Sequence, residues 1–127
     1  MISRLLTTAG LFTCAVFLSA CQPPTQFYWG SYEESLFSRQ QQAGAGGEAQ
    51  AASMLLSTMS HAEPGKAPIG PGIHADYGYL LFKQGQVDEA IAEMQKESAA
   101  YPESKPLMDT MISRIQERKN KEKKPTP

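Results

Sequence analysis

The sequence has few of the residues from which catalytic and metal sites are usually built. Its 127 residues include only two cysteines, two histidines and one tryptophan. Cys14 and Cys21 both lie near the N-terminus, so the rest of the chain has no thiol for a disulfide, a metal ligand or a nucleophile. Neither His61 nor His74 has a second ligand at the spacing of a zinc site. We therefore expect no metal and no other cofactor.

Motifs of the common enzyme classes are also missing. The chain has no Gly-x-Ser-x-Gly sequence, and its glycine-rich segment, residues 43–47, lacks the Gly-Lys-Ser/Thr ending of a phosphate-binding loop. The adjacent carboxylates at residues 33–34 and 88–89 point about 100° apart if they lie on helices. They suit the N-terminal ends of helices better than a shared substrate. The sequence predicts a protein that is not an enzyme.

Neither sign of charge is in large excess. The chain has 12 basic and 13 acidic residues and a net charge of −1, which argues against a nucleic-acid-binding protein. Positive charge gathers near the C-terminus, where residues 114–124 include six basic and two acidic side chains. We interpret this end as a solvated helix terminus leading into a disordered basic tail, residues 118–127. Contact with anionic headgroups or with a partner is the alternative.

No apolar run reaches the roughly 20 residues that a membrane-spanning helix needs. A shorter run, residues 5–18, follows Arg4 and precedes two small residues, which is typical of a secretory signal peptide. Leu18-Ser19-Ala20-Cys21 resembles the lipobox of bacterial lipoproteins. That resemblance implies a signal peptide over residues 1–20, cleavage before Cys21 and acylation of Cys21 with fatty acids such as palmitate. An ordinary secretory signal is the alternative.

Acylation at Cys21 would tie the mature chain to a membrane, since each buried CH₂ of an acyl chain contributes about 0.8 kcal/mol. By resemblance to lipoprotein sorting, Gln22 implies the outer membrane, with the domain facing the periplasm. Residues 21–29 would form a lipidated tether that ends in the aromatic cluster Phe27-Tyr28-Trp29. This cluster suits packing on the domain, the membrane interface or a partner, and packing is the interpretation we favour.

Helical periodicity predicts an all-α domain over residues 30–117. We expect one helix to begin at Ser31, others over 48–62, 73–83 and 87–101, and a fifth to begin at Ser104. We expect a loop over residues 43–47, within the glycine-rich stretch 40–47. The apolar faces of these five helices are, in chain order, Tyr32, Leu36 and Phe37; Ala51, Ala52, Leu55, Leu56 and Met59; Tyr77, Leu80 and Leu81; Ala90, Ile91, Met94 and Tyr101; and Leu107, Met111, Ile112 and Ile115.

Residues 71–104 resemble a tetratricopeptide repeat, a helix pair of about 34 residues. His74 and Glu97 depart from the repeat pattern, standing where it usually has a tryptophan and a small residue. Residues 31–64 resemble a degenerate earlier copy. The resemblance implies two antiparallel helix pairs and a capping fifth helix in a right-handed solenoid; a generic five-helix bundle is the alternative. The matching residues are Gly78 and Ala90 at the two small positions, Gly85 in the turn, Met94 at the large apolar position and Pro102 at the end.

The lipobox is soon followed by Tyr28-Trp29-Gly30-Ser31-Tyr32-Glu33. With these two motifs and the later repeat, the chain resembles the DUF4810 family, small bacterial outer-membrane lipoproteins of unassigned function. Members of that family are found beside lipoproteins similar to the curli secretion channel. The resemblance implies membership of an outer-membrane lipoprotein complex, with a channel-like lipoprotein as a protein partner.

The sequence therefore favours a non-enzymatic adaptor or assembly factor. Tetratricopeptide repeats commonly bind partners through the first helix of each repeat, and by resemblance the binding positions here are Ala75, Tyr79, Phe82 and Lys83. Tyr79 and Phe82 suit an interface, but packing against the preceding helix pair suits them equally. Two other functions stay open: a pilotin-like chaperone or subunit of an outer-membrane channel, and an activator that binds a cell-wall synthase.

Overall fold

The structure is a computed structural model that describes residues 26–123. The predicted signal peptide and Cys21 lie outside this range. Within it the fold is all-α, as predicted, with no strand beyond an isolated bridge between Tyr28 and Ile69. The elements are α2 (Tyr32–Gln41), α3 (Ala45–Ser60), α4 (Ile73–Lys83), α5 (Val87–Ala100), the 3₁₀ turn η1 (Pro102–Ser104) and α6 (Lys105–Lys123).

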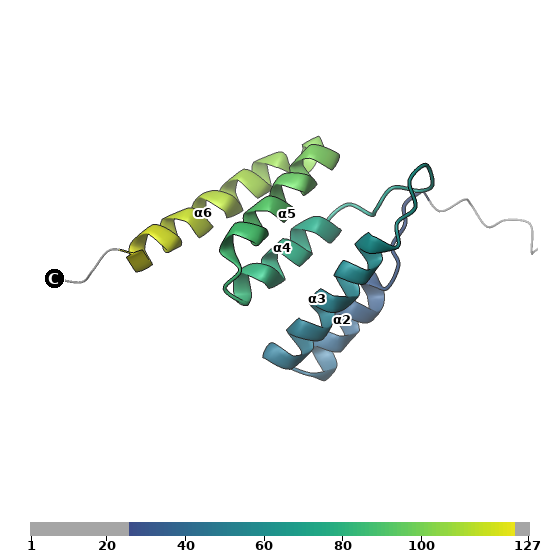
Figure 1. The fold of residues 1–127 in the computed structure, drawn as a ribbon, viewed down its shortest axis with the longest axis horizontal. Coiled ribbons are helices and arrows are strands. Elements are labelled where there is room, and N and C mark those ends of the chain that lie inside the picture. Colours follow the sequence, from purple (N-terminus) through teal and green to yellow (C-terminus); the bar gives the residue numbers. More distant parts are fainter. Residues whose placement is uncertain (1–25, 124–127) are drawn as a thin grey trace, which may run out of the picture.

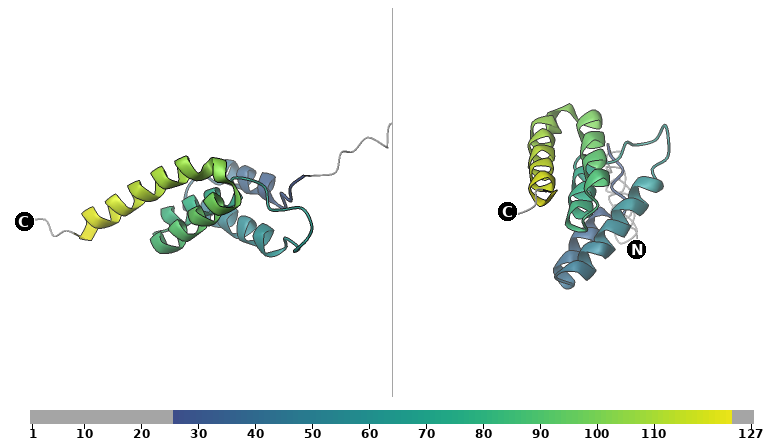
Figure 2. Two further views of the ribbon diagram at one scale, coloured as in Figure 1. Left: turned by 90° about the horizontal axis from the view of Figure 1, so that it is seen from above. Right: turned by 60° about the vertical axis from the view of Figure 1, so that its left-hand side comes forward.

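The five helices pack in sequence order. α2 pairs with α3, α4 pairs with α5, α3 bridges the two pairs by packing on α4, and α6 covers α5 (Figure 1). The C-terminal end of α6 reaches past the α4–α5 pair (Figure 2). This arrangement confirms the prediction of two helix pairs and a fifth helix.

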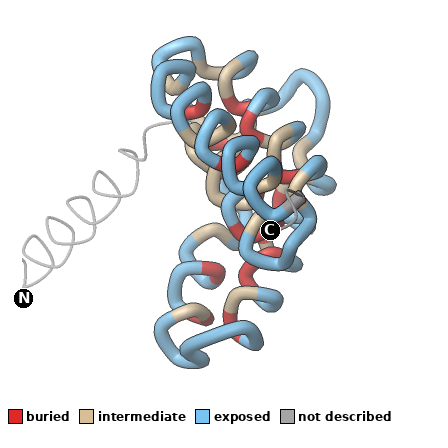
Figure 3. The backbone as a smooth tube through the Cα atoms, turned by 90° about the vertical axis from the view of Figure 1, so that its left-hand side faces the viewer, coloured by how far each residue is buried: buried red, intermediate tan, exposed pale blue. Residues whose placement is uncertain are grey.

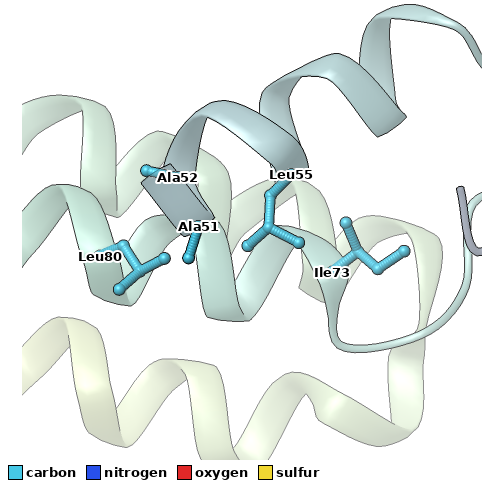
Figure 4. Close-up of a cluster of buried hydrophobic side chains, with 5 residues drawn as sticks. All are labelled: Ala51, Ala52, Leu55, Ile73 and Leu80. Carbon is cyan, nitrogen blue, oxygen red and sulfur yellow. The ribbon is translucent and has the colours of Figure 1, made fainter. Parts of the chain in front are cut away.

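Two apolar clusters hold the helices together. The first joins α3 to α4 through Ala51, Ala52, Leu55, Ile73 and Leu80, whose side chains meet between the two helices (Figure 4). The second joins α5 to α6, and its buried members are Met94, Met108 and Ile115. Buried positions lie on the inner sides of the helices, and the outer turns are exposed (Figure 3). The two helix pairs are thus joined by the α3–α4 cluster, and Ala75 and Phe82 of α4 also pack against the α5–α6 cluster.

The α4–α5 pair agrees best with the sequence. α4 has the predicted bounds, and Gly85 adopts a left-handed conformation, with φ of +83°, in the turn. A Cβ added at Gly78 would lie 2.9 Å from the backbone oxygen of Ala90 and 3.2 Å from Met94 Cγ. The two small residues therefore mark the point where the helices cross closely.

The α2–α3 pair corrects two predictions. α3 begins at Ala45, so residues 45–47 of the predicted loop over 43–47 are helical, and only three residues separate the two helices. Leu36 and Phe37 are 43% and 59% exposed, whereas Ser35 and Ser38 are buried against α3. The serines fit because their small side chains let α3 approach closely, while their hydroxyl groups donate to carbonyl oxygens of α2 itself.

α6 also differs from the prediction. It continues to Lys123, so residues 118–123 are helical and do not belong to a disordered tail. Met108 is buried and Leu107 is 60% exposed, so α6 packs on α5 through a face one position further along than the predicted stripe at its start. Leu56 of α3, at 51% exposed, was likewise wrongly assigned to an apolar face.

Candidate functional site

An open groove of about 450 Å³ lies between the C-terminal end of α4 and the last turns of α6. We call it the α4–α6 groove. Three of the four predicted binding residues, Tyr79, Phe82 and Lys83, form its α4 wall. The other lining residues are Gly85 and Val87 from the turn and the start of α5, and Ile115, Arg118, Lys119 and Glu122 from α6.

The two aromatic residues of the groove differ in their packing. Tyr79 is 44% exposed and lies outside both apolar clusters. Phe82 is half-buried and packs against the Met94–Met108–Ile115 cluster. Phe82 therefore forms the apolar floor of the groove, supported by the following helices and not by the preceding pair. Tyr79 stands at the edge as an accessible ring.

A cation lies near each aromatic ring. Lys83 Nζ is 6.0 Å from the centroid of the Tyr79 ring, and Arg118 Cζ is 5.5 Å from the centroid of the Phe82 ring. Both distances fall within the range of cation–π attraction. Lys83 also donates a hydrogen bond to Glu48 of α3, and this bond raises the pKa of the Lys83 ammonium above its ordinary value. Lys83 therefore carries its positive charge at neutral pH.

Ion pairs fix the α6 wall. Lys119 Nζ lies 2.5 Å from Asp88 Oδ1 at the start of α5, and Arg118 Nε lies 3.0 Å from Glu122 Oε1 within α6. Exposed pairs of this kind contribute only about 0.2–1 kcal/mol each. They matter here because they orient the two cations at the mouth of the groove.

Ala75 does not join the groove. It is half-buried and packs against the Met94–Met108–Ile115 cluster, one turn of α4 away from Tyr79. Sequence reasoning also missed the α6 wall, because residues 118–122 follow the last apolar residue and were assigned to a tail. The i, i+4 spacing of Arg118 and Glu122 was the available signal that the helix continues.

The groove offers little for catalysis. Among its lining residues are one carboxylate, Glu122, and no histidine, cysteine or serine. The two histidines lie elsewhere: His74 Nδ1 is 2.7 Å from Glu93 Oε2, and His61 lies beside Ser57. Over residues 26–123, no three metal-ligating side chains come together. The chemistry that the groove supports is aromatic and electrostatic contact.

Across the same range, no helix has both the length and the apolar character needed to cross a membrane.

The paired helices define a small all-α domain with an open aromatic and charged groove between α4 and α6. The chain belongs to the family described as a domain of unknown function, DUF4810, whose model matches residues 26–111. This confirms the resemblance to the DUF4810 family itself. No curated protein and no solved structure shows significant similarity to the chain. The family match ends within α6, so the α4 wall of the groove lies inside it and residues 115–122 lie beyond it.

Proposed function

We propose that this chain is a non-enzymatic adaptor, tethered to the outer membrane through acylated Cys21, that binds a protein partner in the α4–α6 groove. The observation that carries the proposal is Tyr79, a large ring left 44% exposed beside the charged Lys83 and above an apolar floor. Tyrosine and arginine are enriched among the residues that dominate protein interfaces. The lipobox resemblance supports the tether.

The groove favours a partner segment with an apolar side chain flanked by carboxylates. The apolar side chain of the partner would cover Phe82 and Tyr79. The flanking carboxylates would accept hydrogen bonds from Arg118 and Lys83. These cations already pair with Glu122 and Glu48, so binding exchanges one set of charge pairs for another. The net gain would come from covering the aromatic surface, at about 25 cal/mol per Å² of apolar area.

The family resemblance points to a lipoprotein similar to the curli secretion channel as the partner. In that assembly the chain would act as an interaction subunit or assembly factor. The lipid anchor would confine both proteins to one membrane surface and raise their effective concentration for each other. The same groove would serve an activator of a cell-wall synthase, so the identity of the bound protein decides between the two functions.

Site-directed photocrosslinking in native membranes tests the proposal. A photoreactive phenylalanine analogue at position 79 is expected to give one discrete adduct, and the same analogue at Gln95, exposed on α5, is expected to give none. A channel-like lipoprotein in the adduct supports the assembly function, and a cell-wall synthase supports the activator. Identical adducts from both positions, or none from position 79, would contradict binding in the groove.

A further inference from the structure

A second hollow, of about 540 Å³, lies at the start of the described chain. We call it the N-terminal hollow. Trp29, Tyr32 and Leu36 supply its aromatic and apolar lining, and Glu33 and Glu34 lie beside them with Gly30. Trp29 is 40% exposed and Leu36 is 43% exposed.

Trp29 is fixed in this position. A Cβ added at Gly70 would lie 2.6 Å from Trp29 Cε3, so the indole rests directly on the Gly70 backbone. The Trp29 ring lies 6.3 Å from the ring of Phe27 and 5.6 Å from that of Tyr32, measured between centroids. The flanking backbone is held as well, since Tyr28 N donates to the Pro68 oxygen at 2.7 Å. The packing presents one part of a large ring to the outside instead of burying it.

The charges around the hollow are negative. Glu33 and Glu34 are both exposed in the first turn of α2, where carboxylates suit the helix dipole. Within residues 26–123 neither carboxylate has an ion-pair partner. Aromatic faces beside carboxylates favour a ligand that carries an ammonium group, which both attract. They disfavour an anionic ligand.

The position of the hollow in the chain places it near the proposed membrane anchor. Trp29 follows Cys21 by eight residues, and an extended chain spans at most about 3.6 Å per residue. The hollow therefore lies within about 29 Å of the proposed acyl anchor, on the first part of the domain that the tether reaches. Tryptophan and tyrosine are the residues that prefer the membrane–water interface.

We propose that the N-terminal hollow docks on a zwitterionic lipid surface, with lipid ammonium groups against Trp29 and Tyr32 and beside Glu33 and Glu34. This inference rests on the acyl anchor of the proposed function. The anchor then holds the chain to the membrane, and the hollow sets which side of the domain faces the lipid. A protein partner and a second copy of the chain are the other occupants that the experiment distinguishes.

Trp29 is the only tryptophan, so emission excited selectively from tryptophan, and not from the five tyrosines, reports on the hollow alone. The acylated full chain is reconstituted in phosphatidylcholine–phosphatidylethanolamine vesicles, and its co-flotation with them is measured first. Emission is then recorded with brominated lipids and with aqueous iodide. We expect a blue-shifted emission, strong quenching by the brominated lipid and protection from iodide.

Matched variants test the residues of the hollow. Leu36→Ser is expected to lower brominated-lipid quenching at least about twofold, because it removes apolar surface from the contact. Leu107→Ser changes an equally apolar, 60% exposed residue on α6 and is expected to leave the quenching unchanged. Replacing part of the lipid with phosphatidylglycerol is expected to weaken the quenching, and the double variant Glu33→Gln/Glu34→Gln is expected to remove that sensitivity.

Three results would overturn the proposal in different ways. A chain that co-floats but keeps Trp29 open to iodide would retain the anchor and refute the docking. Protection from iodide without brominated-lipid quenching would assign the hollow to a protein or to a second copy. A chain that fails to co-float would refute the anchor, and with it both the tether of the proposed function and this inference.

Discussion

At the scale of single residues, Glu97 explains a departure from the repeat pattern. The sequence places a glutamate where a tetratricopeptide repeat usually has a small residue, and the structure buries it to 1% exposure. Glu97 Oε1 accepts hydrogen bonds from Gly72 N at 2.8 Å and from Ser104 Oγ at 3.3 Å. Gly72, the N-cap of α4, has no side chain to cap the helix. A carboxylate from α5 thus caps α4 and links it to η1.

Glu97→Ala is therefore expected to lower the free energy of unfolding by about 1–3 kcal/mol, because it leaves the half-buried backbone N–H of Gly72 without its acceptor. Chemical denaturation followed by circular dichroism measures the change. Glu117→Ala, at an exposed position on α6, is the control and is expected to change stability by less than about 0.5 kcal/mol. Equal midpoints for the two variants would show that Glu97 does not support α4.

The helix crossing at Gly78 gives a second prediction, in which the same change from glycine to alanine is compared at a crowded and at an open position. Alanine is the better helix former by about 1 kcal/mol, yet Gly78→Ala is expected to destabilise the chain by about 1–3 kcal/mol. The new Cβ would meet the Ala90 backbone oxygen at 2.9 Å, and backbone atoms do not move aside easily. Gly46→Ala in α3 meets only Gln42 Oε1 at 3.8 Å and is expected to stabilise by about 0.5–1 kcal/mol. Thermal melts of both variants check these opposite signs.

Glu93 predicts a pH dependence. Burial alone would raise its pKa, but hydrogen bonds from Lys96 and His74 outweigh burial and hold the Glu93 pKa below its ordinary value of 4.5. Because the pKa of Glu93 is lower in the folded state, its ionised form stabilises the fold at pH values above the ordinary pKa. This contribution is lost as the pH falls through the lower pKa of the folded state. Glu93→Gln is therefore expected to reduce the fall in melting temperature that the unmodified chain shows between about pH 5 and pH 3. If the melting temperature of the variant falls with pH as steeply as that of the unmodified chain, Glu93 does not supply this pH-dependent stability.

At the scale of helices, the sequence predicts an element well where several signals agree. α4 has a regular apolar stripe, an N-terminal glycine and a turn glycine, and its bounds were correct. α2 has ten residues and only three apolar side chains, which is too few to determine the face that packs. Its contact with α3 depends on Ser35 and Ser38, whose small size is a signal of close packing that hydrophobic periodicity does not detect.

The end of α6 was missed for a different reason. Apolar residues stop at Ile115, but the helix continues through charge pairs, Arg118 with Glu122 and Lys119 with Asp88. The second pair joins residues 31 positions apart and becomes visible only in three dimensions. Sequence patterns therefore predicted one wall of the groove, Tyr79 and its neighbours. For the opposite wall they held only the i, i+4 spacing of Arg118 and Glu122.

Truncation separates the two roles of α6. A chain that ends after Glu117 keeps Met108 and Ile115, which carry the α5–α6 contact, but loses Arg118, Lys119 and Glu122. We expect its melting temperature to fall by only a few degrees and photocrosslinking from position 79 to be largely lost. A chain that ends after Lys123 keeps the groove and is expected to crosslink normally. Full crosslinking by the shorter chain would show that the α6 wall takes no part in binding.

At the scale of the whole molecule, the two proposed surfaces lie at different ends. The chain enters the domain beside the N-terminal hollow, at the end opposite the C-terminus of α6 (Figures 1 and 2). The α4–α6 groove lies at the α6 end, because residues 115–122 form one of its walls. A domain anchored at Cys21 and docked through Trp29 would therefore hold the groove away from the membrane, open to a partner.

This orientation is measurable with single labels. Cys14 and Cys21 are the only cysteines, and cleavage with acylation would leave neither one free, so an introduced cysteine carries the only reactive thiol. A fluorophore at Glu34→Cys, beside the hollow, is expected to be quenched by brominated lipid in reconstituted vesicles. The same fluorophore at Asn120→Cys, on the exposed side of α6, is expected to stay unquenched and open to iodide. Equal quenching at both positions would mean that the domain lies flat on the lipid, and the groove would then have to bind its partner at the membrane surface.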